Sequence, residues 1–242
     1  MRIAFLTVLA ASLAACGSGS GGAPDGTDSV EEDAIADEDP PWDPPADTGE
    51  DVAPEVEEDA GPGTLVGEVL ITYYWVAYEG DTTCTSPSTT LGTCAGEAIA
   101  TVCTEFAEAA RLEGSARLLD GRTINIDCSC AGGFDCFVVL DGTLFPWGMG
   151  SHDNPLVPFV SVATDTSVIA YGTVLYSPDI DGVTLPEGGG THDGCIRADD
   201  VGGGITGMHI DFFAALRSSY TMLDPQIPEN ITLYRDPPRC DI

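Results

Sequence analysis

The cysteines constrain the fold of this chain more than any other feature. Nine occur in 242 residues, and eight of them lie between residues 84 and 240. An even number of cysteines in an exported chain indicates a disulfide framework, and four disulfides are the most economical interpretation. The sequence does not determine how they pair. The eight are Cys84, Cys94, Cys103, Cys128, Cys130, Cys136, Cys195 and Cys240.

A structural zinc site is the alternative interpretation of these cysteines. Cys128 and Cys130 are separated by one residue, so both thiolates are close enough to share a metal ion. No CxxC pair accompanies them in the sequence, and no histidine lies at ligand spacing nearby, although zinc sites usually combine such spacings. The sequence therefore predicts neither a metal site nor a cofactor.

The first 15 residues have the pattern of a cleavable signal peptide. Arg2 forms a short basic region, an apolar run covers residues 3–9, and small residues at 13–15 precede Cys16. A membrane-spanning helix needs about 20 apolar residues, so this run is too short to be one. The small residues before a cysteine resemble a bacterial lipobox, which implies that Cys16 is acylated. An ordinary secretory signal with a free Cys16 is the alternative.

The lipobox resemblance also implies a location. Because Gly17 is not an aspartate, the pattern directs the acylated protein to the outer membrane, facing the periplasm or the cell surface. Residues 16–64 are then an acidic linker of Gly, Ser, Pro, Ala, Asp and Glu, with Trp42 as the exception among them. Such a composition buries too little apolar surface to fold. As a random coil it spans roughly 35 to 40 Å. It either extends the domain from the membrane toward the cell wall or is a solvated tether without a partner.

The charge of the chain excludes some partners. Forty acidic residues stand against eight basic ones, for a formal net charge of -32, and every basic residue is arginine. Nucleic acid and anionic lipid headgroups repel a chain of this charge. Peptidoglycan is mildly anionic as well, so binding to it would have to come from hydrogen bonds and aromatic stacking.

Residues 65–242 have the texture of one mainly β domain. Short apolar or alternating runs are separated by Gly, Pro and Asp, which predicts strands joined by turns. The predicted strands cover residues 66–78, 115–119, 123–127, 137–140, 160–163, 174–177, 194–198, 208–213 and 231–235.

One helix is predicted among these strands. Ala98, Val102, Phe106 and Ala109 recur at helical spacing, and Gly114 follows the end. Cys103 lies within this segment, so we expect a disulfide to connect the helix to the β domain.

Two stretches of the β domain carry a family resemblance. Ser-Val-Ala-Thr-Asp begins at residue 161, and Asp-Asp-Val-Gly-Gly-Gly begins at residue 199, followed by His-Ile-Asp-Phe at 209–212. Both stretches resemble the three-aspartate or 3D domain, a double-psi β-barrel found in membrane-bound lytic murein transglycosylases and related cell-wall proteins. The resemblance covers roughly residues 118–213, with residues 69–78 as a first strand. It implies a six-stranded barrel with a disulfide-stapled helical insertion.

The resemblance implies an activity and a partner. The family cleaves the MurNAc–GlcNAc bond of peptidoglycan, and one acid suffices because the muramic acid C6 hydroxyl attacks internally. The general acid falls on Asp211, with Asp200 orienting it or tuning its pKa and Asp165 holding the barrel. Two carboxyls close together raise the pKa of one of them. The protein is expected to act as a monomer.

Structural roles are the alternative for these residues. All three aspartates are equally suited to accept hydrogen bonds from backbone amides where the psi loops cross. The alternative function is a non-catalytic module that binds cell-wall glycan or serves as structure. The discriminating feature is an acid of raised pKa beside a surface that a sugar strand can reach.

Further residues are candidates for substrate contacts. Gly202, Gly203 and Gly204 permit positive φ and close approach of the backbone to a ligand, or else a tight loop crossing. His209 is a candidate sugar contact, and Trp147 and Tyr171 are candidate stacking surfaces, with core packing as the alternative. His152 and His192 each precede an aspartate, a common dipeptide that predicts no metal site.

The sequence departs from the transglycosylase pattern in three respects. Residues 169–173 read Ile-Ala-Tyr-Gly-Thr where the family has an Ile-Pro-Pro-Gly-Thr type of turn. Thr206 stands where the family has a lysine, so a cation near the acid is missing. The family's second, larger barrel has no counterpart of its size. Residues 79–136, which hold six of the cysteines, are expected to build a smaller disulfide-stapled wall instead.

The anchor is directly testable. Replacing the acylated thiol, Cys16→Ser, should release the protein from the membrane fraction into the periplasmic fraction, because a single serine cannot carry the lipid. Cell fractionation and immunoblotting measure the distribution. A variant that remains with the membranes would contradict the assignment of Cys16 as the anchor.

Overall fold

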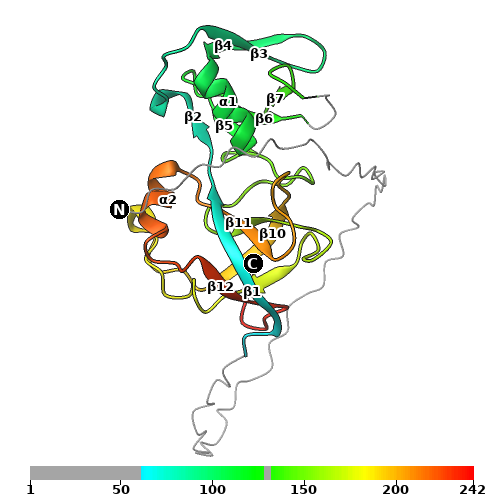
Figure 1. Ribbon diagram of the computed structural model, residues 1–242, viewed down its shortest axis with the longest axis vertical. Helices are drawn as coiled ribbons and strands as arrows, with labels where there is room; N and C mark the ends of the chain where they lie inside the picture. The colour runs from blue at the N-terminus through cyan, green and yellow to red at the C-terminus, as the bar shows by residue number, and fades with distance from the viewer. Residues whose placement is uncertain (1–60, 128–131) are drawn as a thin grey trace, which may run out of the picture. The chain divides into compact units, whose positions relative to one another are not determined.

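The computed structural model of the chain describes residues 61–127 and 132–242. Its centre is a closed barrel with the strand order β1-β11-β8-β10-β9-β12 (Figure 1). Two neighbouring pairs are parallel, β1 with β11 and β8 with β10, and the remaining pairs are antiparallel. This architecture confirms the predicted six-stranded barrel. The strands are β1 (Thr64–Tyr74), β8 (Ser161–Thr164), β9 (Val174–Tyr176), β10 (Cys195–Asp200), β11 (His209–Phe213) and β12 (Asn230–Arg235).

Side-chain alternation separates the inside of the barrel from its outer face. Val69 and Ile71 of β1 and Ile210 and Phe212 of β11 lie in the barrel core. Because successive residues of a strand point to opposite faces, Leu70, Thr72 and Tyr74 of β1 and Asp211 and Phe213 of β11 face outward. A second buried cluster forms on that outer face, from Tyr74, Val76, Leu156, Ala163, Phe213 and Ala215.

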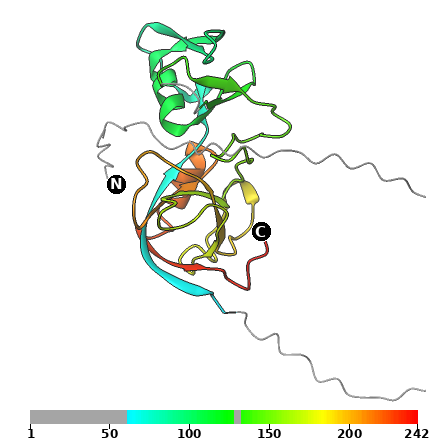
Figure 2. The same ribbon diagram turned by 90° about the vertical axis from the view of Figure 1, so that its right-hand side faces the viewer.

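A second, smaller body follows β1 in the chain, and we call residues 77–139 the cysteine-rich lobe. Its sheet has the order β2-β5-β6-β7, and β3 and β4 form a separate hairpin. Helix α1 (Thr104–Glu113) buries Phe106, Ala107 and Ala110 in the lobe core. Figure 2 shows β1 curving along the barrel before the chain enters β2. The strands are β2 (Ala77–Tyr78), β3 (Ser88–Gly92), β4 (Ala98–Cys103), β5 (Ser115–Arg117), β6 (Thr123–Ile126) and β7 (Phe137–Val139).

The predicted helix begins later than its periodicity suggested. Residues 98–103 form β4, which pairs with β3, and the helix covers Thr104–Glu113. Ile99, Thr101 and Val102 are β-branched and favour an extended backbone, so the hairpin prevails over the helical spacing. The end of the helix was predicted correctly, because Gly114 follows it with a φ of 80°.

Other predictions need smaller corrections. The strand predicted at 66–78 is interrupted at Trp75, and the segment from 118 that was assigned to the barrel forms β6 and β7 of the lobe. Strand β3 and helix α2 (Arg217–Leu223) were not predicted. The other predicted strands agree with the structure to within two residues at each end. Two short 3-10 turns complete the elements, η1 (Glu79–Asp81) and η2 (Pro186–Gly188).

The described cysteines are partly paired. Disulfides join Cys84 to Cys103 and Cys195 to Cys240, and Cys94 is disulfide-bonded as well. The bond at Cys103 therefore staples the start of α1 within the lobe rather than to the barrel, which corrects that expectation. Cys136 is a free thiol.

The free thiol corrects the prediction that all eight cysteines form bridges. Cys136 is 5% exposed at the entrance to β7. Its Sγ accepts a hydrogen bond from the Gly132 backbone N–H at 3.0 Å. The predictions for Cys16, Cys128 and Cys130, and for the signal and most of the linker, lie outside the described residues. Within the described part of the chain, no helix is both long enough and apolar enough to span a membrane.

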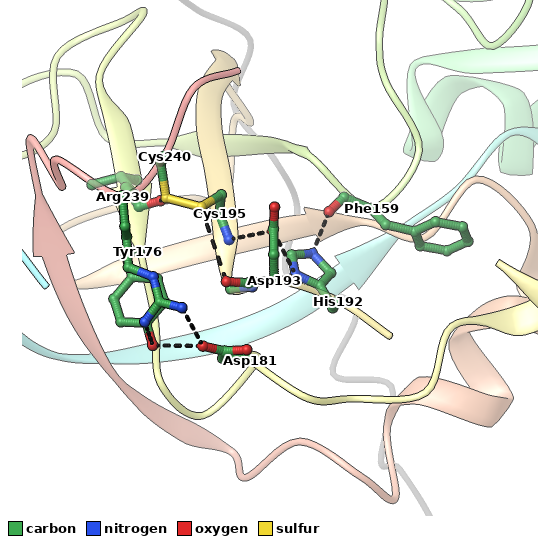
Figure 3. The surroundings of a disulfide bond; sticks show 10 residues. Phe159, Tyr176, Asp181, His192, Asp193, Cys195, Arg239 and Cys240 are labelled. Carbon is green, nitrogen blue, oxygen red and sulfur yellow. Dashed lines mark hydrogen bonds and ion pairs between the residues drawn. A yellow bond between two sulfur atoms is a disulfide. The ribbon is translucent and has the colours of Figure 1, made fainter. Parts of the chain in front are cut away.

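The Cys195–Cys240 bridge fastens the C-terminal segment to the barrel (Figure 3). Beside it, the guanidinium of Arg239 lies 4.5 Å from the centre of the Tyr176 ring and pairs with Asp181 at 3.2 Å. Cys195 is the first residue of β10. The bridge, the ring contact and the ion pair together hold this end of β9 and β10.

Removing this bridge should destabilise the barrel. The double variant Cys195→Ser/Cys240→Ser opens a loop of 45 residues, and loop-closure entropy predicts a loss of about 4 kcal/mol in the free energy of unfolding. Urea unfolding followed by tryptophan fluorescence measures it. A loss below about 1 kcal/mol would show that the surrounding contacts hold the segment without the bridge.

Candidate active site

Strand register brings Asp200 and Asp211 to the same strip of the barrel wall. Ala163 of β8 is the register partner of Asp211 on one side and of Asp200 on the other. Thr72 of β1 extends the row, because it is the register partner of Asp211. Residues in register on neighbouring strands share a face. The small side chain of Ala163 leaves room above it for both carboxyls.

A bulge in β10 places Asp200, and not Asp199, in this row. The register of β10 against β8 advances by one residue between Ala198 and Asp200. Asp199, the extra residue, is 3% exposed and accepts hydrogen bonds from the Arg197 Nε at 2.6 Å and the Ser161 hydroxyl at 2.6 Å. Asp199 is therefore compensated by a cation, and its neighbour Asp200 is not.

The two carboxyls of the row have raised pKa values. Burial removes both carboxylates from water and raises the pKa of Asp200 to about 7 and that of Asp211 to about 6. The charge of Asp211 raises the Asp200 pKa further, whereas the backbone N–H of Val201, which donates at 2.9 Å, opposes the increase. Among the described residues, no ion pair joins either carboxyl to a basic side chain. The pair thus retains a proton at pH values where an exposed aspartate is ionised.

Thr72 orients Asp211. Its hydroxyl donates to Asp211 Oδ1 at 2.7 Å and lies 2.9 Å from His209 Nε2. Because the single hydroxyl proton points to the carboxyl, His209 is the donor to Thr72. The acidic proton of Asp211 is then left on Oδ2, which Thr72 does not occupy. Burial lowers the pKa of His209, so this imidazole is neutral at neutral pH.

Sequence reasoning missed three residues beside this row. They are Thr72, Tyr74 and Glu113. The Tyr74 residue is 8% exposed, and its hydroxyl lies near Asp200 without the geometry of a hydrogen bond within the described residues. Burial raises the Tyr74 pKa far above the usual value, and the nearby aspartates add to the increase. Strand alternation around Asp211 could have indicated Thr72 once β1 was paired with β11, but no sequence signal marks Glu113.

Asp165, for which the resemblance implies a supporting role, has a different environment from Asp200 and Asp211. Its Oδ1 accepts the Ser167 hydroxyl at 2.6 Å, and its Oδ2 accepts the Gly207 N–H at 2.8 Å. These bonds lower the pKa of Asp165, with the Ser167 hydroxyl contributing most. Asp165 is an ionised residue that ties the loop after β8 to the turn before β11.

The glycine triplet does not have the backbone expected of it. None of Gly202, Gly203 and Gly204 has a positive φ, whereas Gly207 does, at 67°. The chain makes an ordinary turn here, in which the Ile205 N–H donates to the Gly202 carbonyl at 3.0 Å. Gly202 is sterically restricted, since a Cβ there would lie 2.7 Å from the Ile205 side chain, whereas a Cβ at Gly204 would have nothing within 4 Å.

The two aromatic candidates, Trp147 and Tyr171, lie near different residues of the row. Trp147 packs partly buried against the outer-face cluster that contains Ala163 and Tyr74, and the Arg117 guanidinium lies 5.5 Å from the centre of its ring. Tyr171 stacks on His152 with ring centres 3.8 Å apart. The charges of Asp199 and Asp200 act on the Tyr171 hydroxyl, so this ring is on the Asp200 side.

His192 is a structural residue. It is 6% exposed, its Nδ1 accepts the Gly194 N–H at 2.8 Å, and its Nε2 lies 2.6 Å from the Phe159 carbonyl, to which it donates (Figure 3). This pattern fixes a neutral imidazole. In the described part of the chain, no group of three or more His, Cys, Asp or Glu side chains is arranged to hold a metal ion.

A cavity of about 430 Å³ lies away from the carboxyl row. Leu65, Ile169 and Met208 are among its lining residues, and Asp200 and Asp211 are not. The chemistry of the row, and not the size of this cavity, therefore identifies the candidate active site.

The sequence around the row matches a known domain. Residues 160–221 match the 3D domain. The matched range of the 3D domain contains Asp165, Asp200, His209 and Asp211 and the glycine triplet, and it spans β8 to β11. Thr72 and Glu113, which precede this range, are not part of the match.

Among solved structures, the chain is similar to several lytic transglycosylases. MltA from E. coli with bound chitohexaose is 16% identical, with a TM-score of 0.45 over 69% of this chain and 71% of that one. LtgG of Burkholderia pseudomallei is 15% identical, with a TM-score of 0.39 over 70% and 72%. A membrane-bound lytic murein transglycosylase from Agrobacterium tumefaciens is 12% identical, with a TM-score of 0.40 over 70% and 74%. No curated protein matches the chain in sequence.

The orienting bond of Thr72 predicts a titration. Thr72→Val keeps the shape but removes the donor that favours the charged carboxylate, so the pKa of Asp211 should rise above about 6, by roughly one to two pH units for a charge-assisted bond. Carbon-13 NMR of the aspartate carboxyls measures it. Thr72→Ser retains the hydroxyl and should leave the pKa near the wild-type value; an unchanged pKa in Thr72→Val would contradict the assigned donor.

Proposed function

We propose that this chain is a peptidoglycan-active, lytic transglycosylase-like lipoprotein that cleaves the bond between MurNAc and GlcNAc with Asp211 as the general acid. The observation that carries the proposal is the uncompensated pair of carboxyls in register on either side of Ala163. A glycosidase acid needs a pKa raised toward neutral pH, and burial raises that of Asp211 to about 6. The match to the 3D domain and the similarity to lytic transglycosylases support the same conclusion.

The reaction follows from one acid. Asp211 donates its Oδ2 proton to the glycosidic oxygen, and the bond from the muramic acid C1 to that oxygen breaks. The muramic acid C6 hydroxyl attacks C1 and forms a 1,6-anhydro ring, and the Asp211 carboxylate takes the proton of that hydroxyl. The acid is thereby regenerated without consuming water.

The residues around Asp211 orient its carboxyl, influence its ionisation and provide surfaces for the sugar. Thr72 holds Oδ1 and so aims Oδ2, and His209 fixes Thr72. Asp200 lies in the same row and resists joint ionisation with Asp211. Trp147 and Tyr171 supply ring surfaces near the row for sugar stacking, and Gly202, Gly203 and Gly204 form the turn that follows Asp200.

The proposal includes the location. Acylated Cys16 anchors the mature chain in the outer membrane, and residues 16–64 act as the tether for a domain of residues 65–242. The glycan of peptidoglycan is the partner, and the protein acts as a monomer without a cofactor.

Product mass tests the chemistry. The protein incubated with purified sacculi should release muropeptides that are one water lighter than hydrolase products. Asp211→Asn should lower the rate by about 10² to 10⁴, the usual contribution of a general acid, and Asp200→Asn should lower it less. Because Asp211 acts in its protonated form, the rate should fall as pH rises through about 6. Liquid chromatography with mass spectrometry measures the products.

Asp236→Asn is a matched control. Asp236 is exposed on the barrel at a positive φ of 52°, which asparagine tolerates, so its activity should equal that of the wild type. Pelleting with sacculi distinguishes the alternative function. If the wild type pellets but releases nothing, the chain is a glycan-binding module, and if it neither pellets nor cleaves, the barrel is purely structural.

A further inference from the structure

Glu113 is the last residue of helix α1 and directly precedes the helix-ending Gly114. Its Oε2 accepts the backbone N–H of Trp75 at 3.1 Å. Trp75 follows the last residue of β1, Tyr74, which is the register partner of Phe213, two residues beyond Asp211. The lobe thereby presents a carboxyl at the end of the strand pair that carries Thr72 and Asp211.

One oxygen of the Glu113 carboxyl, Oε1, has no hydrogen-bond partner among the described residues. Within the described residues, the Trp75 N–H is the one hydrogen bond that the Glu113 carboxyl accepts, and no ion pair includes it. The bond to Oε2 fixes the plane of the carboxyl. Oε1 therefore carries the proton whenever the group is neutral.

Electrostatics keep this carboxyl neutral. Burial raises the pKa of Glu113 to about 8. The bond from the Trp75 N–H and the charge of Arg217 oppose this increase, while the charge of Asp211 adds to it. Two other titratable or charged side chains lie on the strands that pack on α1, namely Tyr78 of β2 and Arg117 of β5. At neutral pH Glu113 is a carboxylic acid, which donates a hydrogen bond where a carboxylate cannot.

Sugar-compatible surface adjoins Glu113. The Trp75 ring stacks on Tyr220 of α2 with centres 5.3 Å apart and planes inclined by 23°, and both rings are half-buried. The buried Tyr74 hydroxyl interacts with the Asp200 carboxyl, which lies in the same row as Asp211.

We propose that Glu113 is a glycan-binding residue of the active site, which donates a hydrogen bond from its neutral carboxyl to a sugar held beside Trp75 and Asp211. This inference rests on the proposed function, since it names a substrate contact of the same site. In this proposal the uncharged carboxyl of Glu113 contributes to the recognition of an anionic glycan. A carboxylate at this place would repel the glycan and would lack the proton to donate.

The sign of the pH dependence follows. Glu113 is neutral below a pH of about 8 and ionises above it, so the contribution of its hydrogen bond to glycan affinity is fully present below that pH and is lost as pH rises through it. A requirement for one proton weakens binding by at most about tenfold for each further pH unit. Binding above that pH must then take up a proton.

Calorimetry with chitohexaose tests the proposal. The full-length protein carrying Asp211→Asn is the parent, so that the probe is not cleaved. Its Kd should rise about 5- to 10-fold as pH rises through the pKa of Glu113, which the loss of the Asp211 charge lowers from its wild-type value, with proton uptake seen as a heat that depends on the buffer. Adding Glu113→Gln, which keeps a neutral donor, should leave the Kd at pH 6 within about threefold and remove both the alkaline weakening and the proton uptake. Adding Glu113→Ala should weaken binding about 5- to 10-fold at pH 6, as expected for one hydrogen bond.

Glu108→Gln is the matched control, because Glu108 is exposed on the same helix; it should retain the parent's pH dependence. Asp200 titrates in every variant, so its effect cancels in the comparison. The proposal is overturned if Glu113→Gln keeps the parent's alkaline weakening, if a folded Glu113→Ala variant binds as tightly as the parent, or if the parent does not bind chitohexaose at any pH. Release of anhydro products from sacculi is measured separately, so the proposed function can stand while this inference fails.

Discussion

The ion pair between Arg197 and Asp199 is the interaction on which the candidate site depends. It compensates a buried carboxylate inside a β-bulge, and the bulge shifts the register of β10 by one residue. A shift of one residue in a strand exchanges its two faces. Without the bulge, Asp199 would be the register partner of Ala163 and would keep Arg197 beside it. Asp200 would then point to the opposite face of the strand, away from Asp211. Asp200 therefore faces Asp211 without a cation because the neighbouring Asp199 takes up the extra position of the bulge and pairs with Arg197.

Much of the fold follows from local sequence, because most strands are short apolar runs bounded by Gly, Pro or Asp. Asp200 and Asp211 were identified by their motif, and the register explains why that motif works. The start of α1 was misjudged, since residues 98–103 satisfy helical spacing and strand propensity at once. Their pairing with β3 decides between the two, and a pairing across the chain is not readable from spacing.

The contributions of β1 and the lobe to the site escaped prediction for a related reason. Thr72 and Glu113 lie 139 and 98 residues before Asp211 in the sequence, and their places depend on the parallel pairing of β1 with β11 and on a hydrogen bond to Trp75. Cys136 illustrates the same limit: an even count suggested a bridge, but burial beside Gly132 gives the thiol a different environment. Composition indicates the cellular compartment and the type of chemistry of a chain. The role of an individual residue depends on contacts between segments that are distant in the sequence.

The bridge between Cys195 and Cys240 has a consequence for when the site is completed. It begins the strand that ends at Asp200, and thiols stay reduced in the cytosol but oxidise after export. In the exported protein proposed above, the strand that aligns Asp200 would therefore be covalently secured only after translocation, once residue 240 has also been delivered. For the proposed wall-degrading activity, this order would complete the strand that carries Asp200 in the compartment that holds the substrate.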